Sequence, residues 1–166
     1  MTPAYFDTSV FLEIFTGSEA APGIRALLRE MKRDKVRIYT SIITVQEVSV
    51  LSFRAGRPFD DNHAKVNRMA RIQTITREIA LTAAKLEAQM IDLTPQKDQI
   101  ENRRRKWDCF HVATAMALGC SALYTTDRGM MAKQSRLKIH GIRFLEPLPQ
   151  KMELFPDVKS DSSAVQ

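Results

Sequence analysis

Apolar positions recur with two different spacings along this chain of 166 residues. Short runs of consecutive apolar or β-branched residues predict buried strands, and the longer stretches between them carry an apolar residue at every third or fourth position, as on one face of a helix. The expected strands are residues 3–6, 36–40, 72–76, 122–125 and 142–145. The expected helices are residues 8–15, 22–31, 41–56, 60–71, 78–93, 107–118 and 130–135. This alternation predicts an α/β fold with a mainly parallel sheet of about five strands covered on both faces.

The composition fits one folded domain. Hydrophobic residues make up 44% of the chain and charged residues 27%, which excludes a wholly disordered protein. We expect a single domain over residues 1–150 and a tail over residues 151–166, disordered at its serine-rich end. No signal peptide is apparent, and no apolar stretch is long enough to span a membrane, so we expect a cytoplasmic protein with no membrane partner.

The charge balance narrows the class of partner. The chain has 25 Lys and Arg against 19 Asp and Glu, a net charge of +6, which favours a polyanionic partner. Neither the phosphate-loop motif G-x-x-x-x-G-K-[ST] nor the dinucleotide motif G-x-G-x-x-G occurs in the sequence. An enzyme that uses a nucleotide cofactor is therefore disfavoured.

Two aspartates directly follow expected strands. Asp7 ends the apolar run Ala4-Tyr5-Phe6, and Asp127 comes just after residues 122–125. The carboxyl ends of parallel strands meet at one edge of a sheet, where ligands of open α/β folds bind. Either aspartate alone is equally well explained as the N-cap of the helix that follows it.

Two further carboxylates lie on the apolar faces of expected helices. Glu47 is four residues from both Ile43 and Leu51, although a capping box with Thr44 is an alternative explanation for it. Asp108 has apolar residues of the next two turns on its own face. Because burying a carboxylate without a cation costs several kcal/mol, we expect a positive partner for each.

Together, the four carboxylates predict a metal centre. Carboxylate clusters with few histidines and no cysteine cage suit a hard cation, above all Mg²⁺ or Mn²⁺. An acidic, metal-binding pocket in a basic protein indicates phosphodiester chemistry, in which the metal polarises the phosphate while Lys and Arg hold the backbone. The expected catalytic and metal-binding residues are Asp7, Glu47, Asp108 and Asp127.

The segments around these carboxylates resemble the four acidic motifs of the PIN domain. They are Tyr5-Phe6-Asp7-Thr8-Ser9, Thr44-Val45-Gln46-Glu47, Trp107-Asp108-Cys109-Phe110-His111-Val112-Ala113-Thr114-Ala115 and Tyr124-Thr125-Thr126-Asp127. The third and fourth segments resemble in particular the VapC-like ribonuclease toxins of prokaryotic toxin–antitoxin pairs. The similarity covers most of residues 3–148 in order and spacing.

This resemblance implies a three-layer α/β/α sandwich in which the first and fourth strands are neighbours and bring the four carboxylates together. It also implies a Mg²⁺- or Mn²⁺-dependent endoribonuclease that hydrolyses RNA, forms a homodimer and is inhibited by a cognate antitoxin protein. Thr125 or Thr126 matches the hydroxyl that supports the last motif, and Thr8 or Ser9 would do the same for the first. Residues 60–105 are longer and more basic than in the shortest family members, which leaves the RNA target and the antitoxin fit open.

Several residues near the motifs have simpler explanations. A lone histidine on an apolar helix face more often makes a structural hydrogen bond, so His111 is left out of the catalytic set. Tyr5 and Trp107 are expected as core anchors and not as base-stacking platforms.

The basic residues of the chain have two explanations. One run lies immediately before Asp108 and is either a solvated helix start or an RNA contact: Arg103, Arg104, Arg105 and Lys106. The other basic helix faces, with Arg68, Arg71 and Arg77, are explained by solubility alone.

Other function classes stay open. A PIN-like protein without a toxin role would bind RNA silently or process it in a housekeeping pathway, and silent binding is disfavoured because no acidic position is lost. A metal-dependent binding module fits the Asp7-Thr8-Ser9 start but needs a hydroxyl where Phe11 stands. A phosphatase with Asp7 as nucleophile needs a second Asp where Ser9 stands.

Overall fold

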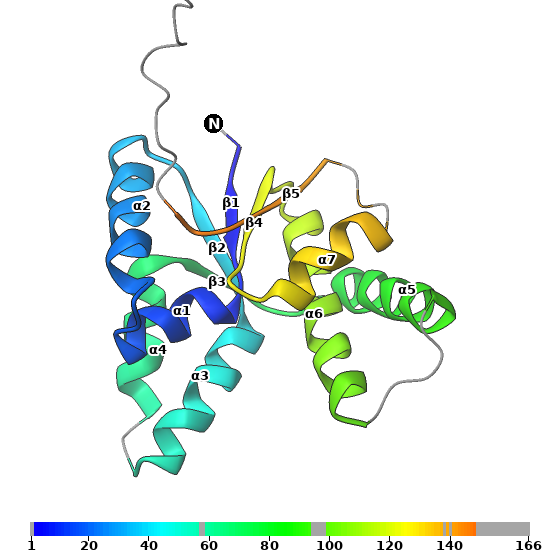
Figure 1. Ribbon diagram of the computed structural model, residues 1–166, viewed down its shortest axis with the longest axis horizontal. Helices are drawn as coiled ribbons and strands as arrows, with labels where there is room; N and C mark the ends of the chain where they lie inside the picture. Colours follow the sequence, from blue (N-terminus) through cyan, green and yellow to red (C-terminus); the bar gives the residue numbers. More distant parts are fainter. Residues whose placement is uncertain (1, 57–58, 94–98, 138, 140, 149–166) are drawn as a thin grey trace, which may run out of the picture.

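The computed structural model describes residues 2–56, 59–93, 99–137, 139 and 141–148. Five strands form one sheet in the order β3-β2-β1-β4-β5, and every neighbouring pair is parallel. The strands are β1 (Ala4–Phe6), β2 (Ile38–Ser41), β3 (Arg71–Gln73), β4 (Ala122–Tyr124) and β5 (Arg143–Leu145). The first strand therefore lies at the centre beside the fourth, as the resemblance implies, and the sheet is entirely parallel (Figure 1).

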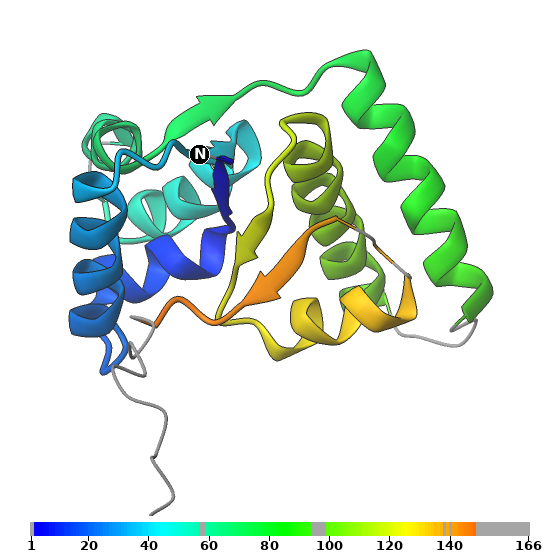
Figure 2. The ribbon, with the colours of Figure 1, turned by 90° about the horizontal axis from the view of Figure 1, so that it is seen from above.

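Seven helices of the described residues cover the two faces of this sheet. They are α1 (Thr8–Thr16), α2 (Ala21–Arg33), α3 (Ile42–Arg54), α4 (Phe59–Met69), α5 (Arg77–Leu93), α6 (Gln99–Ala117) and α7 (Arg128–Arg136). Helices α1 to α4 lie on one side of the sheet and α5 to α7 on the other (Figure 2). The three-layer α/β/α sandwich is confirmed.

The alternation of side chains along β1 divides the core into two clusters. Ala4 and Phe6 face one side of the sheet and pack with residues of α1, α2, α3 and α4, while Tyr5 faces the other side and packs with residues of α5, α6 and α7. Each side of the central strand thus anchors one helical layer.

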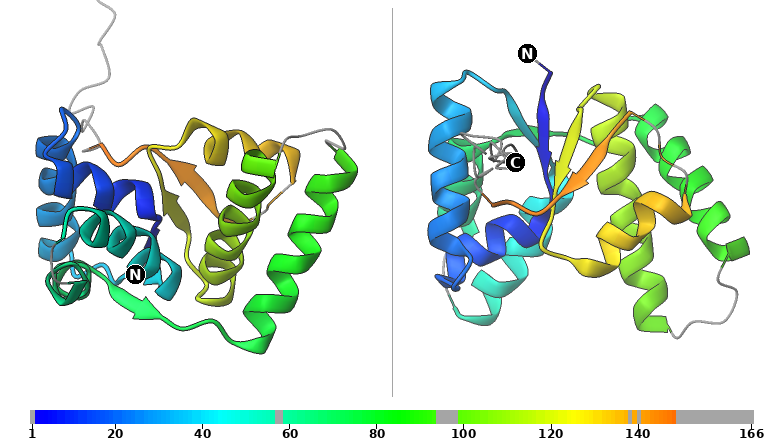
Figure 3. Two further views of the ribbon diagram at one scale, coloured as in Figure 1. Left: turned by 90° about the horizontal axis from the view of Figure 1, so that it is seen from below. Right: turned by 45° about the horizontal axis from the view of Figure 1, so that its top comes forward.

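Helix α6 begins earlier than its apolar pattern predicts. The expected helix begins at residue 107, whereas α6 starts at Gln99. Gln, Glu, Arg and Lys form helices well, but they carry no apolar stripe by which the periodicity reveals them. Helices α5 and α6 lie side by side in Figure 3, so the early start of α6 extends the layer formed by this pair.

Two further expectations concern the tail and a membrane span. The tail over residues 151–166 lies outside the described residues. Among the described residues, no helix has both the length and the apolar character needed to cross a bilayer.

Candidate functional site

Asp7 and Asp127 lie at the same edge of the sheet because the strands that precede them are paired in parallel. Phe6 of β1 is in register with Tyr124 of β4, and the N–H of Asp7 donates to the carbonyl of Tyr124 at 3.1 Å. Both aspartates are also N-caps. Asp7 accepts from the N–H groups of the first turn of α1, and Asp127 Oδ1 does the same at α7. The capping explanation therefore describes their local geometry correctly.

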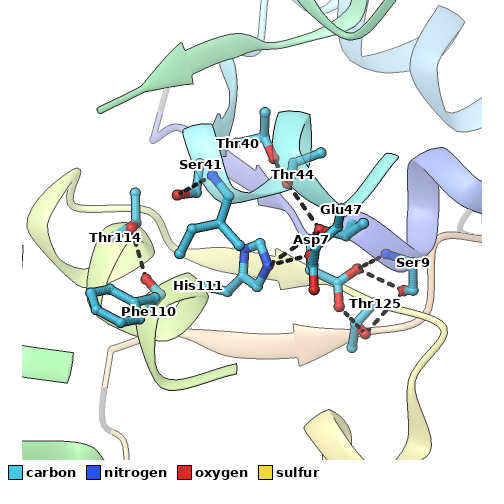
Figure 4. Close-up of polar contacts among 12 residues, drawn as sticks. Asp7, Ser9, Thr40, Ser41, Thr44, Glu47, Phe110, His111, Thr114 and Thr125 are labelled. Atoms are coloured by element: carbon cyan, nitrogen blue, oxygen red, sulfur yellow. Dashed lines mark hydrogen bonds and ion pairs between the residues drawn. The ribbon is translucent and has the colours of Figure 1, made fainter. Parts of the chain in front are cut away.

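A hydroxyl connects the two aspartates. Thr125 Oγ1 donates to Asp7 Oδ2 at 2.6 Å and accepts from the N–H of Asp127 at 3.0 Å. Ser9 Oγ donates to the other oxygen of Asp7 at 2.6 Å and accepts from the N–H of Thr126 at 2.8 Å. Figure 4 shows the side chains of Ser9 and Thr125 next to each other beside the Asp7 carboxylate. Both oxygens of Asp7 are thus held in place.

Glu47 lies beside the same cluster, on α3. The Thr8 hydroxyl, one residue after Asp7, donates to Glu47 Oε2, and His111 Nε2 of α6 lies 3.3 Å from the same oxygen. Of the four expected supporting residues, Ser9 and Thr125 therefore bond Asp7, Thr8 bonds Glu47, and Thr126 contributes its backbone N–H.

His111 occupies a central position that the sequence analysis did not assign. Its side chain is 3% exposed, its Nδ1 lies 2.8 Å from the Tyr5 hydroxyl, and its Nε2 is shared between Glu47 and Thr8. Figure 4 shows the His111 ring directed at Glu47. The expectation of a structural hydrogen bond holds for the contact with Tyr5. The contact with Glu47 spans 64 residues of sequence and could be found only from the packing of α3 on α6.

Burial and charge shift the pKa values of this group in opposite directions. Burial raises the pKa of Asp7, although the His111 charge and the Ser9 and Thr125 hydroxyls oppose it. Burial would also raise the pKa of Glu47, but its hydrogen bond with His111 and the His111 charge hold that pKa below its ordinary value. Burial lowers the pKa of His111, yet Glu47 and the neighbouring aspartates outweigh this and raise it. A protonated His111 facing an ionised Glu47 is the consistent state.

Asp108 has a different positive partner. The ammonium of Lys133, on α7, donates a hydrogen bond to Asp108 Oδ2. The Lys133 side chain is 12% exposed and the Asp108 side chain 15%. Burial still raises the pKa of Asp108, with Lys133 opposing it and the charge of Asp127 adding to it. The expectation of a cation beside each helix-borne carboxylate is therefore met by His111 at Glu47 and by Lys133 at Asp108.

The donor chemistry fits a hard divalent cation. The acidic residues of the site offer carboxylate oxygens, with hydroxyls supporting them, and such oxygens suit Mg²⁺ or Mn²⁺. Among the described residues, no group of three or more His, Cys, Asp or Glu side chains is arranged to hold a metal ion. In this arrangement His111 and Lys133 supply the positive charge that faces the carboxylates.

The basic run before Asp108 lies in the first half of α6. The side chains of Arg103 and Arg104 are outside the described part of the structure, Arg105 is buried and Lys106 is exposed. Lys106 is therefore the member of the run whose described side chain faces solvent. Tyr5 is a core residue as expected, but the expectation for Trp107 is wrong, because that side chain is 38% exposed.

The fold and the site define an α/β protein that gathers acidic side chains at the carboxyl edge of a parallel sheet. The model of the PIN domain family matches residues 4–136, a stretch that contains all four carboxylates. The chain therefore belongs to the PIN domain family, whose members are nucleases. A search among curated proteins finds no match to the chain.

Solved structures with the same fold include proteins of toxin–antitoxin systems. A toxin–antitoxin complex from Klebsiella pneumoniae is 19% identical with a TM-score of 0.56, and the match covers 87% of this chain and 97% of that one. VapBC-1 from nontypeable Haemophilus influenzae is 13% identical with a TM-score of 0.58 and the same coverages, 87% and 97%. The sarcin-ricin loop cleaving toxin VapC20 of Mycobacterium tuberculosis is 15% identical with a TM-score of 0.54, over 78% of this chain and 93% of that one. At these identities the likeness shows the fold.

Proposed function

We propose that this protein is a Mg²⁺- or Mn²⁺-dependent endoribonuclease and the toxin of a toxin–antitoxin pair. The observation that carries the proposal is the arrangement at the sheet edge in a member of a nuclease family, where the Thr125 hydroxyl donates to the Asp7 carboxylate and accepts from the backbone N–H of Asp127. Glu47 reaches the same cluster through Thr8, and the charges of His111 and Asp127 act on Asp108. The catalytic and metal-binding roles of these four carboxylates are part of the proposal.

The chain's own residues hold the two carboxylate oxygens of Asp7 in place. Asp7, Glu47, Asp108 and Asp127 would hold the cation, which when bound supplies a Lewis acid for the phosphate and lowers the pKa of a bound water. The hydrogen bonds of Ser9 and Thr125 fix both oxygens of Asp7 before substrate arrives, so little reorganisation is needed in the reaction. Lys106, which is exposed on α6, would hold a phosphate of the RNA backbone.

The toxin role and the protein partners rest on the solved structures and on the surface. The similar structures from Klebsiella pneumoniae and Haemophilus influenzae are toxin–antitoxin assemblies, which supports an antitoxin partner for this protein. Val50 and Phe53, one turn apart on α3, are 43% and 65% exposed, and apolar exposure of this kind supports a homodimer. Light scattering of the purified protein tests the dimer directly.

The test of the nuclease is RNA cleavage by the purified protein, with Mg²⁺, with Mn²⁺ and with EDTA, followed by mapping of the new 5′ ends. Asp7→Asn should abolish metal-dependent cuts, while Asp92→Asn, a matched change on the exposed face of α5, should leave them intact. Cleavage that survives in Asp7→Asn would overturn the catalytic assignment. Tight RNA binding without turnover would favour an RNA-binding adaptor, and cleavage without any growth defect on expression would favour a housekeeping RNA-processing role.

The two alternatives outside RNA chemistry have less support in the geometry. A phosphatase with Asp7 as nucleophile needs a second Asp at position 9, where Ser9 stands and donates its hydroxyl to Asp7 instead. Phe11, at the position where a metal-dependent binding module needs a hydroxyl, is fully buried in the core.

A further inference from the structure

A second feature of the surface lies away from the carboxylates. A cavity of about 660 Å³ opens between α2, α4 and the edge of the sheet formed by β2 and β3. Its wall contains five basic side chains and no Asp or Glu. We call it the basic groove and define it by these five residues: Arg29, Lys32, Arg37, Arg68 and Arg71.

The charges of the basic groove are not neutralised by the part of the protein that the structure describes. Ion pairs in that part involve other cations, such as Arg33 with Asp34, Lys65 with Asp61 and Lys133 with Asp108. Within the described ranges none of the five groove residues makes an ion pair or a side-chain hydrogen bond. Five like charges gathered around one hollow repel one another, so an anionic ligand would relieve that repulsion.

The groove lies at the opposite edge of the sheet from the candidate active site. Arg37 directly precedes β2 and Arg71 is the first residue of β3, which places both at the amino ends of the parallel strands. Asp7 and Asp127 follow the carboxyl ends of β1 and β4. In Figure 2, helices α2 and α4 that border the groove lie at the far end of the molecule from α5. The groove is therefore separate from the four carboxylates.

The chemistry of the groove matches a phosphate backbone. Four of its five cations are arginines, whose planar guanidinium groups bind phosphate through two parallel hydrogen bonds. The cations come from α2, the start of β2, α4 and β3, so they are spread over the hollow and suit a chain of phosphates better than one compact anion. Apolar side chains also line the groove, such as Leu28, Val36 and Met69, and these would make van der Waals contacts with sugars and bases.

We propose that the basic groove binds the phosphate backbone of the RNA substrate at a distance from the site of cleavage. This inference rests on the proposed function, because it assigns the groove to the same RNA. Four carboxylates at the active site repel the backbone, and anchoring from a remote basic surface supplies affinity that the active site itself does not. The groove would thus set how tightly RNA is held, and the carboxylates would set how fast it is cut.

The experiment is an RNA-binding titration of the full chain in EDTA, where cleavage is absent. The probe is a fluorescein-labelled single-stranded RNA of mixed sequence, about 20 nucleotides long, measured by anisotropy at several salt concentrations. The variant Arg37→Glu/Arg71→Glu should bind at least about tenfold more weakly, and the slope of log K against log salt should fall by about 1.4, or about 0.7 for each lost phosphate contact. A second variant, Arg29→Glu/Arg68→Glu, changes only exposed helix positions and should behave in the same way.

The matched control is Arg77→Glu/Lys85→Glu, which makes the same change in net charge on exposed positions of α5. It should bind RNA within about twofold of the wild type if position matters and net charge alone does not. Circular dichroism melting of every variant establishes that it is folded. In cleavage assays with Mg²⁺ or Mn²⁺, the groove variants should raise KM and leave kcat at saturating RNA unchanged.

Two results would overturn the inference while leaving the proposed function intact. One is an equal loss of RNA affinity in the groove variants and in the α5 control, which would make the effect one of net charge. The other is unchanged RNA binding in the groove variants, and if these then fail to bind a co-expressed antitoxin the groove is a protein-binding surface. A wild-type protein that cuts no RNA with either metal would instead refute the proposed function itself.

Discussion

Lys133 donates a hydrogen bond from its ammonium to the carboxylate of Asp108, and this contact joins α7 to α6 at the edge of the candidate active site. The pair is largely buried, so the charge of Lys133 acts on Asp108 with little screening by water. A divalent cation that binds to Asp108 therefore meets a positive charge that is already in place.

Replacement of Lys133 by Met should tighten the binding of Mn²⁺ to the protein. Removal of a competing cation from Asp108 is expected to increase the affinity on the order of tenfold. Isothermal titration calorimetry with Mn²⁺ measures this directly, and Lys85→Met, an exposed change on α5, is the control. Equal affinities for Lys133→Met and the wild type would show that Lys133 does not compete for the site.

Thr125 should be required both for stability and for activity. Thr125→Val removes the hydroxyl that donates to Asp7 and accepts from Asp127, and it leaves a buried carboxylate oxygen without that partner. We expect a loss of about 1–3 kcal/mol in the free energy of unfolding, together with a loss of RNA cleavage. Thr125→Ser should recover most of both, as measured by urea denaturation and by the cleavage assay. If Ser proved as damaging as Val, the methyl group and not the hydroxyl would be the important part.

Substitution of Asp127 separates its two roles. Asn caps a helix about as well as Asp, whereas Ala does not, so Asp127→Ala should destabilise the protein by about 1 kcal/mol and Asp127→Asn should not. Both should lose metal-dependent cleavage, because both lack the carboxylate. Thermal melting measures the stability of the two variants, and the cleavage assay measures their activity. Full activity in Asp127→Asn would assign this residue to helix capping alone.

The pair of His111 and Glu47 predicts how stability changes with pH. The raised pKa of His111 means that its contribution is complete below the unfolded pKa near 6.5 and is lost as pH rises through the higher folded pKa. The lowered pKa of Glu47 means that its contribution is complete above the unfolded pKa near 4.3 and is lost as pH falls through the lower folded pKa. The pair therefore stabilises the fold most between about pH 4.3 and about pH 6.5.

This pH dependence is tested with His111→Gln, which keeps hydrogen-bonding capacity but carries no charge. The free energy of unfolding of the wild type should fall more steeply than that of the variant as the pH rises above about 6.5. Urea denaturation at a series of pH values gives both curves. Parallel curves over this range would show that His111 is neutral in the folded protein.

The secondary structure could be predicted wherever an element buries one face. In α2, Ile24, Leu27 and Met31 are all buried, and their spacing is what predicts the helix. The first half of α6 shows the limit of this approach, because its charged residues form a helix without an apolar stripe. Asp7 and Asp127 were predictable at the sheet edge because each directly follows a strand.

The partners of the carboxylates were not predictable from sequence. The need for a cation beside Glu47 and Asp108 follows from the cost of burying a charge, but its identity does not. Lys133 lies 25 residues after Asp108, and His111 lies 64 residues after Glu47. Such pairs depend on how helices pack against one another in three dimensions, and this packing cannot be predicted from residue spacing along the chain.

The central place of β1 in the sheet also determines when the site can exist during synthesis. β1 is the first strand made, yet its neighbour β4 is made more than one hundred residues later, and the Thr125 hydroxyl that holds Asp7 follows β4. A ribosome that has not yet released this region carries a chain in which Asp7 lacks that partner and Asp127 is absent. The proposed nuclease would therefore be inactive until β4 and Thr125 have been made and have paired with β1, and an antitoxin already present would meet the site as soon as it forms.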